Sequence, residues 1–222
     1  MFPNAGGTIE LFKSLSSELQ SEFDCFSFEY PGHGTNKNGF CETIDLLVDN
    51  ALMFFLNHHL PGTDYILMGY SMGSIVIMEL LSRLKTQNTN SPMGVIIAAD
   101  PPINMLSENV YFTEEQCIKA FYMKNGNISE KLMNSKLFRR IYLPSFRNDY
   151  RIMKSYNYSE LIKKEFDIRA LIFYCEEDTP LEIMHGWDSC FVEAPKYIHF
   201  SGGHFFIKDH VKEISKEIIS YF

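Results

Sequence analysis

Short apolar runs alternate along this chain with longer segments whose apolar residues recur at helical spacing. The runs are typical of buried strands, and they cover residues 25–30, 65–68, 93–99, 169–175 and 197–200. The helical segments are expected at residues 8–22, at 42–59, after residue 72 and at 207–221. Strands that alternate with helices predict βαβ units and a mainly parallel sheet flanked by helices, which is an α/β fold.

The alternation stops between about residues 103 and 160, where the pattern predicts helical fragments at Glu114–Lys124 and Glu130–Ile141. This stretch is rich in aromatic residues and methionine, at Phe112, Phe121, Tyr122, Met123, Met133, Phe138, Tyr142 and Phe146. Such side chains either pack the segment onto the sheet or line a pocket for an apolar ligand. At the start of the chain, Thr8 is the expected N-cap of the first helix.

The segment Gly69-Tyr70-Ser71-Met72-Gly73 reads G-x-S-x-G and stands between a strand-like run and a helical pattern. In that context the motif forms a nucleophile elbow, a sharp turn that exposes the serine. The turn is so tight that its neighbours must be small, which explains the two glycines. Because the pentapeptide also occurs by chance, its assignment depends on finding partners for Ser71.

A serine nucleophile needs a histidine base, and in this order of motifs the base follows the serine. His204 lies in a Gly-Gly-His loop directly after an apolar run, where it can reach over the edge of the sheet. His199 falls inside the strand pattern and His210 in the last helix, so both are expected to be structural or solvent-facing. We therefore expect His204 to be the base. The histidines that precede Ser71 are disfavoured by the chain order: His33, His58 and His59.

Two carboxylates compete to orient this base. Asp178 follows the run at 169–175, and Asp100 follows the run at 93–99. Both occupy the carboxyl end of an expected strand, where ligands and catalytic groups gather in open α/β sheets. The residues favour Asp178 and leave Asp100 as the alternative, with a turn role before Pro101 as its simpler explanation.

Five short sequence blocks occur in a fixed order over nearly the whole chain. They are Phe2–Gly7 (F-P-x-A-G-G), Pro31–Gly34 (P-G-[HR]-G), Gly69–Gly73 (G-H-S-M-G), Leu143–Tyr150 (L-P-x-x-R-x-D-[YF]) and Gly202–Phe205 (G-G-H-F). Together they resemble type II thioesterases of nonribosomal peptide and polyketide synthesis, which are editing enzymes of the α/β-hydrolase superfamily. The block at 143–150 is the most discriminating, since general esterases lack it.

The resemblance implies an α/β-hydrolase fold with a helical lid insertion at about 103–160. It matches the acid to Asp178, and it assigns the oxyanion hole to the backbone N–H groups of Met72 and Ala5. Tyr70 replaces the histidine usual before the nucleophile, a change that we expect to be tolerated. The family carries a strand before its F-P-x-A-G-G block, and that first strand is apparently missing here, because the chain starts at Met1-Phe2-Pro3.

Composition limits the classes of protein to which this chain can belong. At 222 residues and 45% hydrophobic content, the chain is expected to be a single domain, 1–222, with a sizeable core. It contains no apolar run of transmembrane length and no secretory signal pattern. The five cysteines are scattered and show no metal-type spacing, which indicates a reducing cytoplasm and no metal site. The absence of phosphate-loop and dinucleotide motifs predicts that the reaction needs no cofactor.

Charge is unevenly distributed along the chain. Residues 111–169 carry a net charge of +5 within a protein of net charge −8. An acidic protein of this kind is not expected to bind nucleic acid, but its basic lid could meet an acidic partner by local complementarity. Acidic carrier proteins, to which the resemblance points, are partners of this kind. The alternative is that the basic charge of this segment only makes a solvated surface.

The sequence thus predicts a monomeric serine thioesterase that hydrolyses acyl thioesters from the phosphopantetheine arm of carrier proteins. Its expected role is to edit mis-primed or stalled synthetases. A medium-chain acyl thioesterase of fatty acid synthesis is the alternative within enzymes, and a lipase or carboxylesterase fits the 143–150 block less well. A degenerate, non-catalytic interaction protein is the alternative outside enzymes.

Overall fold

The computed structural model describes residues 1–87, 89–102 and 130–222. The expected helix at 114–124 lies outside these residues. So do four of the side chains named above as possible pocket residues, namely Phe112, Phe121, Tyr122 and Met123. None of the described helices combines the length and apolar character needed to cross a bilayer.

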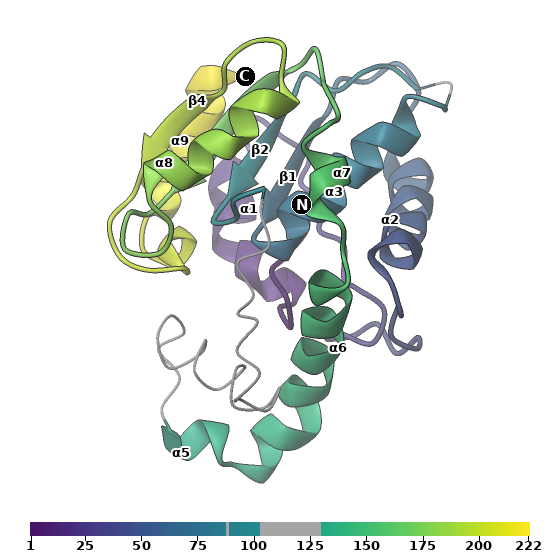
Figure 1. Ribbon diagram of the computed structural model, residues 1–222, viewed down its shortest axis with the longest axis vertical. Helices are drawn as coiled ribbons and strands as arrows, with labels where there is room; N and C mark the ends of the chain where they lie inside the picture. The colour runs from purple at the N-terminus through teal and green to yellow at the C-terminus, as the bar shows by residue number, and fades with distance from the viewer. Residues whose placement is uncertain (88, 103–129) are drawn as a thin grey trace.

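A parallel sheet of four strands in the order β1-β2-β3-β4 forms the centre of the molecule (Figure 1). The strands pair in register so that Tyr70, Ala98 and Phe173 lie side by side, with Tyr174 beside His199. Their carboxyl ends therefore meet at one edge of the sheet, as expected for successive βαβ units. The strands are β1 (Ile66–Tyr70), β2 (Gly94–Ala98), β3 (Arg169–Tyr174) and β4 (Lys196–His199).

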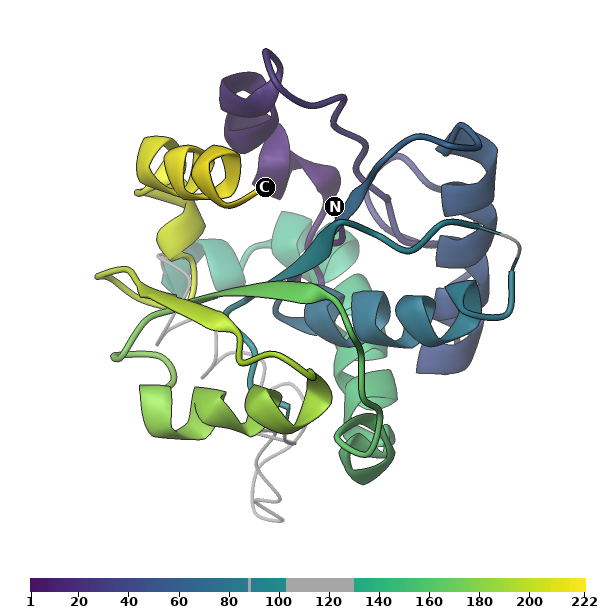
Figure 2. The ribbon, with the colours of Figure 1, turned by 90° about the horizontal axis from the view of Figure 1, so that it is seen from above.

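Helices cover both faces of this sheet (Figure 2). The longer ones are α1 (Lys13–Leu19), α2 (Ile44–His58), α3 (Met72–Leu84), α6 (Leu143–Lys154) and α9 (Val211–Tyr221). The shorter ones are α5 (Glu130–Met133), α7 (Tyr158–Leu161) and α8 (Leu181–Met184). The described residues also form the 3-10 helices η1 (Ile9–Phe12), η3 (His185–Cys190) and η4 (Phe206–Lys208) and the π-helix η2 (Phe138–Tyr142).

Two apolar cores result, one on each face of the sheet. Met68 and Ile96 pack with α1 and α9 on one face. Leu67 and Val95, which point the other way, pack with α2, α3 and α6. Because successive strand residues face opposite sides, a strand buried on both faces reads as a continuous apolar run. This explains why the sequence pattern identified β1, β2 and β3, which are almost wholly buried, within a few residues. The edge strand β4 is exposed or half-buried along its length, and the short run at 197–200 identified it.

The expected strand at 25–30 is not formed, and this prediction was wrong. The segment does run beside the start of the chain, where Phe28 donates its N–H to the Met1 carbonyl at 2.9 Å. Phe2 in turn bridges to Gly69 of β1. Only Met1 and Phe2 therefore lie between β1 and this segment. Two residues are too few to build a regular ladder, so the segment stays extended without becoming a strand.

The amino end of β1 borders a cavity of about 420 Å³. Apolar side chains from several segments line it, among them Phe23, Phe26 and Phe55 together with Ile66 and Leu67 of β1. Its lining includes none of Ser71, Asp178 or His204. The cavity thus lies beside Met1 and Phe2, at the end of β1 opposite Ser71, and it is not a pocket of the candidate site.

Thr8 and Thr43 differ in how they begin their helices. Thr8 stands at the N-cap of η1, as expected, but its side chain makes no capping hydrogen bond. Thr43 instead caps α2 by accepting from the Leu46 N–H at 3.1 Å. The segment expected as one helix over 8–22 is divided into η1 and α1, and the last helix expected over 207–221 into η4 and α9.

The turn between β1 and α3 is held by contacts that only glycine permits. A Cβ on Gly69 would lie 2.3 Å from the Gly73 carbonyl oxygen, and one on Gly73 would lie 2.0 Å from the Phe2 carbonyl oxygen. Both neighbours are backbone atoms, which cannot rotate away. The start of α3 consequently packs directly against the chain at Phe2–Pro3.

We expect Gly73→Ala to destabilise the protein by about 1–3 kcal/mol, the usual cost of overpacking a tight contact. The added methyl must displace the backbone at Phe2 or the first turn of α3. Gly39→Ala is the matched control, because a Cβ there meets nothing within 4 Å. Urea unfolding of both variants checks the prediction, and equal stability of the two would contradict it.

Candidate active site

Ser71 stands at the tip of the turn between β1 and α3, as the G-x-S-x-G motif predicts. Its backbone has φ 52° and ψ −123°, a conformation that residues with a Cβ seldom adopt. The strain is held in place by its N–H, which donates to the Ala98 carbonyl at 2.7 Å. A strained serine at a strand-to-helix turn is the backbone geometry of a nucleophile elbow.

Asp178 and His204, the predicted acid and base, lie in direct contact. Their Oδ2 and Nδ1 atoms are 2.8 Å apart, and the side chains are only 10% and 6% exposed. An ionised carboxylate can only accept hydrogen bonds, so Nδ1 carries the proton in this pair. Nε2 is then the nitrogen through which His204 can take up a proton from a nucleophile.

Tyr70 supports His204 from beneath, a role that the sequence reasoning missed. The buried phenol donates to the backbone carbonyl of His204 at 2.5 Å, and the two rings meet edge to face. The tyrosine that replaces the family's histidine at this position therefore fixes the loop that carries the base. Its place beside the serine was visible in the sequence, but its partner lies 134 residues away.

Asp100, the alternative acid, has no hydrogen bond to His204 among the described residues. Its side chain is buried, and its Oδ2 atom lacks a hydrogen-bond partner within the described part of the chain. Burial, and then the nearby charge of Asp178, raises the pKa of Asp100 well above its usual value. Burial thus favours the neutral form of Asp100, and its backbone carbonyl accepts from the Trp187 indole at 2.7 Å.

Residues 4–7 form a turn next to the elbow. Gly7 donates its N–H to the Asn4 carbonyl at 2.9 Å, and Gly6 at the third position has φ 66°. A positive φ at this position is what a type II turn requires. The Gly6 N–H points away from the turn and donates to Asp149 Oδ2 at 2.7 Å. The N–H of Ala5 takes no part in closing the turn.

Met72 supplies a second backbone donor close to Ser71. It is the first residue of α3, and the first N–H of a helix has no acceptor within that helix. The positive end of the helix dipole also lies there. Ala5 and Met72, the two predicted oxyanion donors, thus belong to segments that meet where Phe2–Pro3 packs on Gly73.

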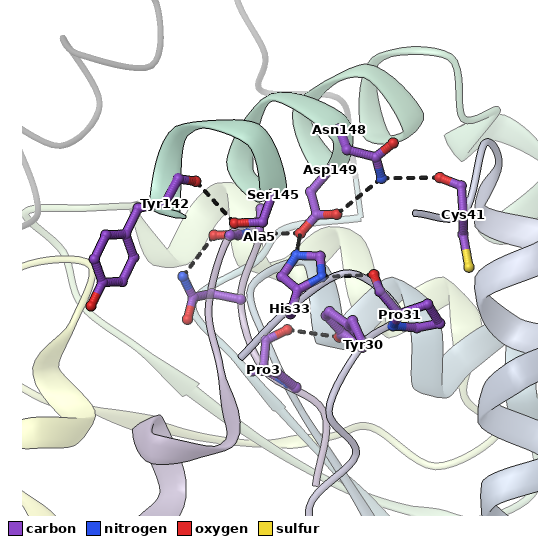
Figure 3. A network of polar contacts seen from close by, with 12 residues as sticks. Pro3, Ala5, Tyr30, Pro31, His33, Cys41, Tyr142, Ser145, Asn148 and Asp149 are labelled. Carbon is purple, nitrogen blue, oxygen red and sulfur yellow. Dashed lines mark hydrogen bonds and ion pairs between the residues drawn. The ribbon is translucent and has the colours of Figure 1, made fainter. Parts of the chain in front are cut away.

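A buried polar network surrounds the turn at residues 4–7 (Figure 3). Asp149 of α6 contacts both the Gly6 N–H and the His33 ring, at 2.7 and 2.9 Å. Tyr30 donates its hydroxyl to the Pro3 carbonyl at 2.8 Å. The sequence reasoning gave neither Asp149 nor His33 a role, although both belong to blocks that carry the resemblance. Their occurrence in two such blocks was the signal that could have linked them.

The parallel sheet brings three predicted site residues to one edge. Ser71 follows β1, Asp178 follows β3 and His204 follows β4, and the register aligns the ends of these strands. Within the described part of the chain, no group of His, Cys, Asp and Glu residues is arranged to hold a metal ion. The chemistry available at this edge is that of a serine, a histidine–aspartate pair and backbone donors.

Two curated proteins are similar to this chain over almost its whole length. Thioesterase PikA5 of Streptomyces venezuelae is 23% identical over 219 residues, which cover 97% of this chain and 77% of that protein. A probable cadicidin biosynthesis thioesterase of Streptomyces griseus is 22% identical over 98% of this chain, which spans only 60% of that relative.

A solved structure shows the same fold. ClbQ, from the colibactin NRPS/PKS pathway, superimposes with a TM-score of 0.86 at 20% identity. The match covers 99% of this chain and 93% of ClbQ. It confirms the predicted α/β-hydrolase fold. The model of the thioesterase domain family matches residues 1–221, and the chain therefore belongs to the thioesterase domain family.

Proposed function

We propose that this protein is a serine thioesterase that hydrolyses acyl thioesters from the phosphopantetheine arm of carrier proteins, and so edits mis-primed or stalled synthetases. The observation that carries the proposal is the Asp178–His204 pair at 2.8 Å, at the same sheet edge as the strained Ser71. A family match over residues 1–221 supports the class of reaction.

In the first half of the reaction, Ser71 Oγ attacks the carbonyl carbon of the acyl thioester while His204 Nε2 takes the serine proton. Asp178 holds the imidazole in the tautomer with its proton on Nδ1 and stabilises the imidazolium that forms. Collapse of the tetrahedral intermediate breaks the C–S bond. His204 returns the proton to the departing thiolate, which leaves an acyl-serine and a free phosphopantetheine thiol.

In the second half, His204 takes a proton from water, and the resulting hydroxide attacks the acyl-serine. The acid is released, and Ser71 regains its proton from the imidazolium. In both halves the negative charge on the acyl oxygen is stabilised by the N–H groups of Ala5 and Met72. An oxyanion donor of this kind contributes about 3–4 kcal/mol to transition-state stabilisation. The proposed reaction uses no metal or cofactor.

The relatives support a carrier-protein substrate. PikA5 is named as a thioesterase, and ClbQ comes from the colibactin NRPS/PKS pathway. The described cysteines, Cys25, Cys41, Cys175 and Cys190, are all free thiols. This fits a reducing compartment, and we place the reaction in the cytoplasm, with the protein acting as a monomer.

A basic and partly apolar surface on η2 and its flanks suits the approach of an acidic carrier protein. Residues 131–154 carry seven Lys and Arg residues and one carboxylate, Asp149, which is buried. Arg139 and Arg140 are exposed there, beside Leu137 and Ile141, which are each 55% exposed. Such a mixture of basic and apolar side chains steers an acidic partner and then offers it a contact.

Ser71→Ala is expected to abolish hydrolysis of an acetyl-phosphopantetheinyl carrier protein and labelling by a fluorophosphonate probe, because no other group can form the acyl-enzyme. Ser82→Ala on the same helix, where the hydroxyl only bonds the Met78 carbonyl, is the control and should keep full activity. Turnover by Ser71→Ala would overturn the assignment. A preference for medium or long acyl chains would point to fatty acid synthesis instead.

Asp178→Asn is expected to lower kcat about 10⁴-fold, because an amide facing Nδ1 favours the wrong imidazole tautomer. Asp100→Asn should lower kcat less than about tenfold, because Asp100 makes no hydrogen bond to His204 among the described residues and asparagine has the shape of the neutral carboxylic acid that burial favours there. Steady-state kinetics of both variants on the acetyl carrier protein decides between them. The reverse order of effects would move the acid to the end of β2.

Reversing two charges with Arg139→Glu and Arg140→Glu is expected to raise KM for the carrier-bound substrate about tenfold, because the surface would then repel an acidic carrier. Values of kcat and the hydrolysis of a small soluble ester should not change. The matched control reverses two exposed lysines on α9, Lys212→Glu with Lys216→Glu. An equal rise in KM in both double variants would show that net charge, and not this surface, is responsible.

A further inference from the structure

We infer that Asp149 and His33 are positioning residues for the oxyanion hole: as a buried pair they anchor Gly6 and thereby orient the N–H of Ala5 toward the acyl oxygen. This inference rests on the proposed function, which assigns the oxyanion to Ala5. It goes further because it makes the orientation of the Ala5 N–H depend on Asp149 and His33 (Figure 3). These two side chains come from distant parts of the chain and take no part in the reaction itself.

The hydrogen bonds of His33 determine its protonation state. Nδ1 lies 3.0 Å from the Pro31 carbonyl oxygen, and Nε2 lies 2.9 Å from Asp149 Oδ2. Both partners accept hydrogen bonds, so both ring nitrogens must donate, and only the imidazolium has two N–H groups. The arrangement is therefore a cation paired with a carboxylate, although the two side chains are only 1% and 2% exposed.

The same carboxylate oxygen anchors the turn at residues 4–7. Asp149 Oδ2 accepts from the Gly6 N–H at 2.7 Å as well as from His33. Gly6 also packs against Phe146, where a Cβ would lie within 2.5 Å of the ring. The peptide group that ends in the Gly6 N–H begins at Ala5. Fixing that N–H therefore restricts the rotation of Ala5, whose own N–H is the proposed donor.

Other contacts support the rest of the segment but do not reach the Gly6 N–H. The Tyr30 hydroxyl donates to the Pro3 carbonyl, and the Asn4 side chain donates to the Ala5 carbonyl at 2.9 Å. Asn148 ties α6 to the Cys41 carbonyl at 3.0 Å. In the described contacts, Asp149 alone joins α6 to the backbone of the turn at residues 4–7 through a hydrogen bond.

The charge of His33 makes this anchor sensitive to pH. Burial lowers the pKa of His33, but the hydrogen bond and charge of Asp149 outweigh it, with help from the Pro31 carbonyl and Glu29, and the pKa rises above its usual value. The titratable groups around it are Asp149 on α6, Glu29 and Tyr30 on the preceding segment, and Cys41 before α2.

Because the folded-state pKa is raised, the contribution of the pair is complete below the unfolded value of about 6.5 and is lost as pH rises through the raised value. The acid limb of a kcat profile reports protonation of the general base. An alkaline limb is expected where His33 loses its proton and the anchor weakens.

The test uses the full chain and p-nitrophenyl acetate, a small ester that requires the nucleophile and oxyanion hole but no carrier protein. Asp149→Ala is expected to lower kcat about 10- to 100-fold, as for a misplaced catalytic group, with KM changed less than about threefold. His33→Arg keeps a cation at every pH and should move the alkaline limb to higher pH. The control is His185→Gln, which breaks an exposed His185–Asp188 pair of similar length, 2.9 Å.

Asp149→Asn keeps the shape of the side chain without its charge, so it tests the proposal even if Asp149→Ala does not fold. It should retain more activity than the alanine variant and lose the alkaline limb. The proposal is overturned if folded Asp149→Ala keeps kcat within about twofold of the wild type, if only KM changes, or if the alkaline limb is the same in all variants.

The two proposals fail in different ways. An inactive Ser71→Ala together with an active Asp149→Ala refutes the anchor alone. Activity retained by Ser71→Ala refutes the nucleophile, and with it the oxyanion hole. Hydrolysis of the small ester without hydrolysis of the acetyl carrier protein refutes only the proposed substrate, and the anchor is still measured on the ester.

Discussion

The contact on which the site depends is that between the first turn of α3 and the backbone at Phe2–Pro3. A Cβ on Gly73 would lie 2.0 Å from the Phe2 carbonyl oxygen, so this approach requires glycine. It places the start of the segment that contains Ala5 directly against the helix whose first N–H belongs to Met72. One close approach of two backbones thus positions the serine and both proposed oxyanion donors together.

The rest of the site follows from parallel strands that end at one edge. Their register aligns Tyr70, Ala98, Phe173 and the neighbouring β4, so the loops that leave them converge. Two similar carboxylates at the ends of these strands then differ in their surroundings. Asp178 is paired with His204, whereas burial and the nearby charge of Asp178 keep the pKa of Asp100 high. The fold therefore gives different surroundings to two aspartates that follow neighbouring strands: Asp178 has an imidazole partner, and the buried Asp100 does not hydrogen-bond to His204 in the described part of the chain.

Helix α6 connects the insertion to the reacting groups. Phe146 packs on Gly6 and Asp149 bonds its N–H, so the helix both covers and anchors the turn that carries Ala5. The same helix follows a basic surface at Arg139 and Arg140. Arg139 and Arg140 lie in η2, which leads directly into α6, so the proposed docking surface is continuous with the helix that contacts the Gly6 N–H.

The α/β fold, the four described strands and the sharp turn at Ser71 were all predictable from the sequence, and the structure brings the predicted acid Asp178 into contact with the predicted base His204. The strands and the turn are local patterns: an apolar run buried on both faces and small residues at a sharp turn can be read within a few positions. The strand expected at 25–30 was wrong, because pairing depends on a neighbour, and only Met1 and Phe2 lie beside it. Only the tertiary structure could pair His33 with Asp149, 116 residues apart, or Tyr70 with the His204 carbonyl. Hydrogen bonds between distant segments leave no periodic signal, since they depend on where the folded backbone brings a single donor and a single acceptor together.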